Sequence, residues 1–167
     1  MLWKNEYNIV ESHLFTGTKT TLRMMRLGKV RQVKLRVNKE KCTGCLSCVL
    51  ACSFSHFKYF DMSKSRVSVS GTHDLAEFEP SVCIQCEERY CVNSCPTGAL
   101  SVNSATGVVT LDKDKCVGCK VCLKSCPYGG VKWDADSSNP LICDLCGGDP
   151  QCVKHCRYPE ALYVEEG

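Results

Sequence analysis

The sequence contains few of the residues that usually build a hydrophobic core. Its 167 residues are 44% apolar, but 16 of these are cysteine, and aromatic residues make up only 8% of the chain. Without the cysteines, the apolar share falls to about 34%, which is a weak basis for folding a chain of this length by hydrocarbon burial. We infer that disulfides or bound metal organise this protein.

The sequence also lacks long hydrophobic runs and export signals. No segment reaches the roughly 18 consecutive apolar residues that a membrane span requires, and residues 1–6 do not begin an apolar signal region. A twin-arginine pair is absent as well. From these absences we expect a cytoplasmic protein without a membrane span, whose thiols stay reduced. That environment favours metal binding over disulfides.

The net charge of +3 is unevenly distributed along the chain. Residues 1–41 carry a balance of +7, and residues 42–167, which contain every cysteine, carry −4. The basic residues of the first segment alternate with Leu, Val and Met, which favours a protein-docking segment over a nucleic-acid surface. We therefore expect residues 1–32 to form an N-terminal leader or docking arm, and we expect no nucleic-acid partner.

The cysteines fall into four groups of four, and their spacing is the most specific feature of the sequence. Groups one and three have the C-x2-C-x2-C-x3-C spacing of bacterial ferredoxins, while groups two and four widen the middle interval to four and five residues. The members are Cys42, Cys45, Cys48 and Cys52; Cys83, Cys86, Cys91 and Cys95; Cys116, Cys119, Cys122 and Cys126; and Cys143, Cys146, Cys152 and Cys156.

This spacing suits 4Fe-4S clusters, in which each of four irons takes one thiolate. Three closely spaced cysteines can bind three irons from one loop, and the fourth cysteine points toward a neighbouring cluster. We expect that fourth cysteine to begin a short helix. Sixteen thiolates thus predict four 4Fe-4S clusters, with all sixteen cysteines as metal ligands and no catalytic residue.

Three alternatives explain the pattern less well. Zinc sites would use four thiolates per ion, but zinc does not require a fourth cysteine three residues after the third in every group. Disulfides would have to join closely spaced cysteines to distant partners. An enzyme acting through a cluster would need an iron without a protein thiolate, and no group lacks its fourth cysteine. We therefore predict an electron-transfer protein and not an enzyme.

Segments around the cysteine groups repeat. Val33–Cys45 matches Val108–Cys119, and each predicts a short strand, a charged turn and a cysteine loop. Pro96–Val102 and Pro159–Val164 each predict a turn that leads into a strand. The predicted fold is α+β, with two bacterial-ferredoxin-like units of short strands and short helices around cluster-binding loops, related by a pseudo-two-fold repeat.

Residues 83–133 resemble an entire two-cluster bacterial ferredoxin, through Cys95-Pro-Thr-Gly-Ala-Leu followed by Gly107-Val-Val-Thr-Leu-Asp. The four-group layout of residues 33–167 resembles the polyferredoxin iron–sulfur subunits of molybdenum and tungsten oxidoreductases, of the dimethyl sulfoxide reductase type. The segment Ser53-Phe-Ser-His56 resembles the short relatives that serve tungsten aldehyde oxidoreductases, benzoyl-coenzyme A reductases and carbon monoxide dehydrogenases. With the short four-group layout, the chain is most similar to the small electron-transfer subunits of tungsten aldehyde oxidoreductases. Ser53 and Arg157 stand where a ferredoxin usually has proline after the fourth cysteine.

The resemblance implies a domain division and a set of ligands. It implies a tandem ferredoxin-like domain over residues 33–167, with an inner unit at about 80–135 and an outer unit formed by 33–79 with 136–167. The implied ligand sets are Cys83, Cys86 and Cys91 with Cys126; Cys116, Cys119 and Cys122 with Cys95; Cys42, Cys45 and Cys48 with Cys156; and Cys143, Cys146 and Cys152 with Cys52.

The resemblance also implies a function. It describes a subunit that relays electrons to or from a large tungsten- or molybdenum-pterin catalytic subunit of the aldehyde oxidoreductase kind. A hydrogenase or carbon monoxide dehydrogenase partner, or a free polyferredoxin, is the alternative. The leader is expected to bind either the large subunit or further copies of this chain.

Overall fold

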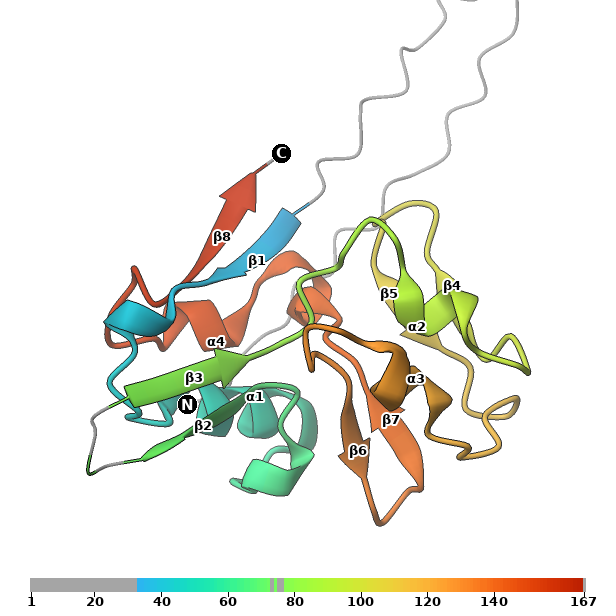
Figure 1. The fold of residues 1–167 in the computed structure, drawn as a ribbon, viewed down its shortest axis with the longest axis horizontal. Coiled ribbons are helices and arrows are strands. Elements are labelled where there is room, and N and C mark those ends of the chain that lie inside the picture. The colour runs from blue at the N-terminus through green and yellow to red at the C-terminus, as the bar shows by residue number, and fades with distance from the viewer. Residues whose placement is uncertain (1–32, 73, 75–76, 167) are drawn as a thin grey trace, which may run out of the picture.

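The computed structural model describes residues 33–72, 74 and 77–166 (Figure 1). Within this part of the chain, short strands pair into four two-stranded antiparallel sheets, and four α-helices lie between them. These small elements agree with the predicted α+β class of ferredoxin-like units. The predicted leader, residues 1–32, lies outside the described residues.

The bounds of the elements are as follows. The strands are β1 (Val33–Val37), β2 (Ser68–Thr72), β3 (Glu77–Ser81), β4 (Leu100–Val102), β5 (Val109–Leu111), β6 (Lys132–Asp134), β7 (Asn139–Leu141) and β8 (Leu162–Glu166). The α-helices are α1 (Ser47–Phe57), α2 (Tyr90–Asn93), α3 (Val121–Ser125) and α4 (Gln151–Lys154). The 3-10 helices are η1 (Lys39–Lys41), η2 (Met62–Lys64) and η3 (Leu145–Gly148).

The strands predicted beside the cysteine groups are confirmed. β1 and β5 precede groups one and three, and β4 and β8 follow groups two and four. In each case the alternation or turn signal is local, because it lies within a few residues of the strand that it predicts. Local signals of this kind do not determine which strands pair.

Strand pairing brings the two ends of the described chain together. β1 pairs with β8 in antiparallel register, from Lys34 opposite Glu165 to Val37 opposite Leu162, whereas the other three sheets are hairpins of consecutive strands. Figure 1 shows the β1–β8 sheet on one side of the molecule and the β4–β5 and β6–β7 hairpins on the other. Helices α1 and α4 pack together, so groups one and four lie close in space.

The interior is built largely from cysteine loops and small aliphatic side chains. Of the 21 buried apolar residues described, seven are cysteine and none is aromatic. Leu35 and Leu162, which come from the paired strands β1 and β8, are among the most completely buried side chains. In the described part of the chain no helix is long and apolar enough to cross a membrane.

Candidate metal centres

Each cysteine group lies on a loop that leads directly into a helix. The four helices begin one residue before the third cysteine of each group, at Ser47, Tyr90, Val121 and Gln151. The prediction that the fourth cysteine begins the helix is therefore wrong. Cys52 lies inside α1, whereas the fourth cysteines of the other groups follow the ends of their helices.

The early helix start has a backbone cause. In three groups the residue before the helix has a left-handed conformation, which turns the chain out of the loop immediately before the third cysteine. These residues are Leu46, Arg89 and Lys120, with φ of 59°, 48° and 60°. Where proline follows the fourth cysteine, as in Cys95-Pro and Cys126-Pro, the helix has already ended.

A second left-handed residue is common to all four loops. It directly precedes the second cysteine in each group, at Gly44, Gln85, Gly118 and Leu145, with φ of 69°, 53°, 68° and 56°. Glycine adopts this conformation readily, but Gln85 and Leu145 do not. Both are only 4% exposed, so packing holds them in place. All four loops therefore share this turn before the second cysteine, despite their different spacings.

Two sets of cysteines surround hollows in the protein. One hollow, which is partly open to solvent, is lined by Cys95, Cys116, Cys119 and Cys122. The other is lined by Cys42, Cys45, Cys48 and Cys156. In both, three cysteines come from one group and the fourth from another, and apolar side chains such as Trp133 and Leu162 complete the walls.

Electrostatic interactions identify further thiols that lie near one another. Burial, followed by the charges of Cys91, Cys126 and Cys86, raises the pKa of the Cys83 thiol to about 11. Burial, with Cys52 and Cys146 among the nearby charges, raises the pKa of Cys152 to about 12. Cys126 therefore lies near the group-two loop, and Cys52 lies near the group-four loop.

These pKa shifts test whether the thiols suit a cluster. Burial also raises the pKa of Cys143 well above its usual value, and Cys152 raises it further. Buried thiolates that repel each other ionise together only when a cation is bound between them. Four converging thiols with apolar walls thus fit a site for an iron–sulfur cluster, which takes one thiolate per iron.

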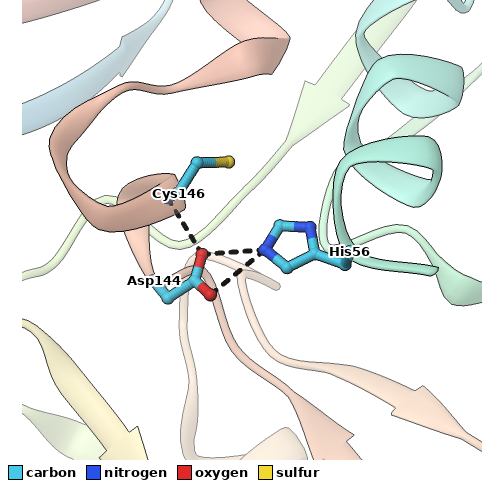
Figure 2. Close-up of side chains that lie close together, drawn as sticks. All are labelled: His56, Asp144 and Cys146. Atoms are coloured by element: carbon cyan, nitrogen blue, oxygen red, sulfur yellow. Dashed lines mark hydrogen bonds and ion pairs between the residues drawn. The ribbon is translucent and has the colours of Figure 1, made fainter. Parts of the chain in front are cut away.

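An ion pair joins helix α1 to the group-four loop (Figure 2). The His56 Nε2 atom lies 3.0 Å from the Asp144 Oδ1 atom, and its Nδ1 atom lies 2.8 Å from the Cys52 carbonyl oxygen. The same Asp144 oxygen accepts a 2.9 Å hydrogen bond from the Cys146 amide. The Asp144 carboxylate, followed by Cys52, raises the pKa of His56 to about 10.

The pKa of the Asp144 carboxylate is shifted in the opposite direction to that of His56. Burial raises its pKa, but hydrogen bonds from His56 and the Cys146 amide outweigh burial and hold the pKa at about 2. Ligand atoms of His56, Asp144 and Cys146 lie within 4.8 Å of one another. Because Cys146 already belongs to a cysteine set, this trio is part of that set's surroundings and not a separate metal site.

Three side chains that contact the cysteine loops were not predicted from the sequence. Gln85 donates a hydrogen bond to the Cys143 carbonyl, the Arg66 side chain donates one to the Ile142 carbonyl, and Asp144 pairs with His56. Most of these contacts join residues 58 or more positions apart. No local motif marks such residues, so the sequence offered no signal for them.

Comparison with known protein families agrees with this geometry. Residues 75–166 match the family model described as "4Fe-4S dicluster domain", and a second model with the same description matches residues 41–99. The chain belongs to the 4Fe-4S dicluster family. As a member of this family it binds 4Fe-4S clusters.

Individual relatives are named as subunits of oxidoreductases or as an electron transport protein. The chain is 37% identical over 125 residues to the aliphatic sulfonate oxidoreductase polyferredoxin-like subunit of Pyrococcus furiosus, covering 75% of this chain and 72% of that one. It is 32% identical over 142 residues to the electron transport protein HydN of Escherichia coli, covering 70% and 79%. It is 37% identical over 126 residues to the phenylglyoxylate dehydrogenase subunit beta of Aromatoleum evansii, of which it spans 28%.

A solved structure has a similar fold. The active-site complex BamBC of benzoyl coenzyme A reductase with 1,5-dienoyl-CoA contains a chain with a TM-score of 0.51 and 27% identity, covering 83% of this chain and 78% of that chain. With relatives named as a polyferredoxin-like subunit and as an electron transport protein, this chain is an electron-transfer subunit.

Proposed function

We propose that this chain carries four 4Fe-4S clusters and relays electrons through them. The proposed ligands are the sixteen cysteines in the four sets that the resemblance implies. One observation carries the proposal: every cysteine loop is approached by a fourth cysteine from a different group. When bound, each cluster takes up and releases electrons. The chain holds the clusters close together and shields them with apolar walls.

The arrangement of the sets supports a linear order. Cys152 interacts electrostatically with Cys48, Cys143 with Cys83, and Cys122 with Cys91. Each contact joins one set to the next. The proposed sequence therefore runs from the Cys42 set through the Cys143 and Cys83 sets to the Cys116 set. In this order the outer unit holds the first two clusters and the inner unit the last two, as the proposed pseudo-two-fold repeat requires.

Solvent exposure of the cysteines supports the same order. Cys45 and Cys119 are the exposed cysteines, and each belongs to a set at one end of the row. The two middle sets contain buried and half-buried cysteines. Beside Cys119, the Val117 side chain is 69% exposed, as expected where a partner protein would cover it. Electrons would enter at one exposed end and leave at the other.

We further propose that the partner is a tungsten- or molybdenum-pterin catalytic subunit of the aldehyde oxidoreductase kind. The short four-group layout and Cys52-Ser-Phe-Ser-His56 support this partner through their resemblance to the small subunits of such enzymes. The likeness to a polyferredoxin-like subunit of another oxidoreductase also supports a large catalytic partner. The leader is the proposed docking arm for that partner or for a second copy of this chain.

The test is anaerobic purification of the native complex followed by metal analysis. We expect about sixteen irons per chain, since four clusters hold four irons each, together with a large subunit that contains tungsten or molybdenum. Nickel in the large subunit would instead indicate a hydrogenase or carbon monoxide dehydrogenase. Absence of any large subunit would indicate a free polyferredoxin. Zinc in place of iron would contradict the four-cluster proposal itself.

A further inference from the structure

Arg66 links the two parts of one cysteine set. It lies between η2 and β2, and its backbone amide donates a 3.3 Å hydrogen bond to the Cys52 Sγ atom. Its side chain reaches in the other direction, where the Nε atom donates a 2.9 Å hydrogen bond to the Ile142 carbonyl. The Nη2 atom lies 3.9 Å from the Asp144 carboxylate. The guanidinium therefore contacts the residues on either side of Cys143.

The remaining guanidinium nitrogen has no partner within the described part of the protein. The Nη1 atom is buried and forms no hydrogen bond there, although the whole side chain is 16% exposed. A buried donor without an acceptor is costly, and native proteins rarely leave one. Arg89 provides a contrast, because its Nη1 and Nη2 atoms donate to Gln85 and to the Gly107 carbonyl. An acceptor for Arg66 Nη1 must therefore come from outside the described residues.

We propose that Arg66 is a positioning residue for the cluster bound by Cys52, Cys143, Cys146 and Cys152, and that its Nη1 atom donates a hydrogen bond to a sulfur of that cluster. This proposal rests on the proposed function. The location supports it, because the guanidinium lies beside Cys143 while the Arg66 amide contacts Cys52. Sulfur is the acceptor that a bound cluster would supply at this position.

The consequence is a higher reduction potential for this cluster. Reduction adds negative charge, and a fixed nearby cation with a hydrogen bond to sulfur stabilises the reduced form. A guanidinium stays protonated at all working pH values. Asp144 only partly offsets its charge, because that carboxylate is shared with His56 at 3.0 Å. Arg66 would thus make the second cluster in the proposed order, the one bound by the Cys143 set, easier to reduce.

The experiment uses the full chain, purified anaerobically and labelled with arginine that carries ¹⁵N only at its two terminal guanidinium nitrogens. Pulsed EPR of the reduced wild-type protein should detect coupling between a cluster and this ¹⁵N. The coupling should disappear in Arg66→Met and persist in Arg36→Met, a matched change at an exposed arginine paired with Glu165. Labelling only the terminal nitrogens excludes the Arg66 backbone amide, which already contacts Cys52.

Redox titration of the same variants gives the second measurement. In Arg66→Met, the equilibrium constant for reduction of one of the four clusters should fall by at least about tenfold. For a one-electron step this lowers the reduction potential of that cluster by about 59 mV. In Arg66→Lys, which keeps the positive charge, the reduction potential of this cluster should fall less. In Arg36→Met, all four potentials should equal those of the wild type.

Unchanged potentials in an iron-replete Arg66→Met protein, or coupling that persists in that variant, would overturn the proposal. If Arg66→Met loses iron, the proposal is decided by two other measurements. These are the coupling to ¹⁵N in the wild-type protein and the reduction potential in Arg66→Lys. Absent coupling in a wild-type chain with about sixteen irons also overturns it. A wild-type chain that lacks sixteen irons would instead contradict the proposed function.

Discussion

The side-chain amide of Gln85 donates a 2.6 Å hydrogen bond to the backbone carbonyl of Cys143. This bond joins the group-two loop to the group-four loop, the two middle positions of the proposed relay. The Gln85 oxygen accepts hydrogen bonds from the Val109 amide at 3.1 Å and from Arg89 at 2.9 Å. The buried side chain of Gln85, a residue with a left-handed backbone conformation, therefore satisfies three groups from different segments.

Replacing Gln85 should weaken the contact between the two middle cysteine sets. In Gln85→Leu, the Cys143 carbonyl and the Val109 amide lose their partners, and each unsatisfied buried group costs about 1–3 kcal/mol. We expect a lower temperature of cluster loss, measured by visible absorbance under anaerobic conditions. Gln151→Leu is the control, because that amide bonds only to neighbouring Asp149. Equal temperatures for the two variants would contradict this role of Gln85.

A buried ion pair connects the segment after α1 to the β6–β7 hairpin. The Lys64 ammonium contacts Asp134, and Lys64 and Asp134 are each only 5% exposed. Lys64→Met leaves the Asp134 carboxylate buried without a cation, so we expect thermal stability to fall clearly. Adding Asp134→Leu should recover part of the loss, because it removes the uncompensated charge. Lys154→Met, which breaks an exposed pair with Asp149, should change little. A double variant no more stable than Lys64→Met would count against the explanation.

Gly130 permits close packing against the group-two loop. A Cβ atom at this position would lie 2.6 Å from the Cys83 Cα atom and 2.8 Å from its amide nitrogen. Since both are backbone atoms, Gly130→Ala should displace Cys83 and reduce iron content by about one cluster. Gly98→Ala is the control: it imposes left-handed strain, but its Cβ meets no atom within 4 Å. The measurement is the iron content per chain, which should fall in Gly130→Ala and stay unchanged in Gly98→Ala. Equal iron content in the two variants would contradict this role of Gly130.

The protein should require its clusters to stay folded. A third of the buried apolar residues in the described part of the chain are cysteines, so metal binding by these thiols supplies much of the folding free energy. Removing iron with a chelator and an oxidant should abolish most circular dichroism of the native state, and anaerobic reconstitution with iron and sulfide should restore it. Slow amide hydrogen exchange in the iron-free chain would show that the fold stands without clusters.

Deleting residues 1–30 tests the docking arm. We expect the shortened chain to keep about sixteen irons, because every cysteine follows residue 41, while co-purification with the large subunit weakens. The measurement is the ratio of large to small subunit after native purification. Replacing the basic residues of this segment with glutamine would separate charge from apolar contacts. An unchanged subunit ratio after the deletion would exclude the segment from docking.

The sequence predicted the local elements of this fold well. The strands β1, β4, β5 and β8 occur where turns and alternating residues indicate them, because those signals lie within the segment that folds. The position of the helix start was predicted wrongly. It depends on left-handed residues such as Arg89 and Lys120, which have no side-chain preference for that conformation and adopt it only in the folded loop.

By itself, the sequence determined that this protein has four cysteine loops and an iron–sulfur chemistry, because ligand spacing along a loop is a local property. Only the tertiary structure decided which side chains from distant segments contact each loop. Gln85 meets Cys143, Lys64 meets Asp134 and Arg66 meets Ile142 across 58 to 76 positions of sequence. Contacts of that range arise from strand pairing and helix packing between distant segments, which leave no periodic pattern in the chain.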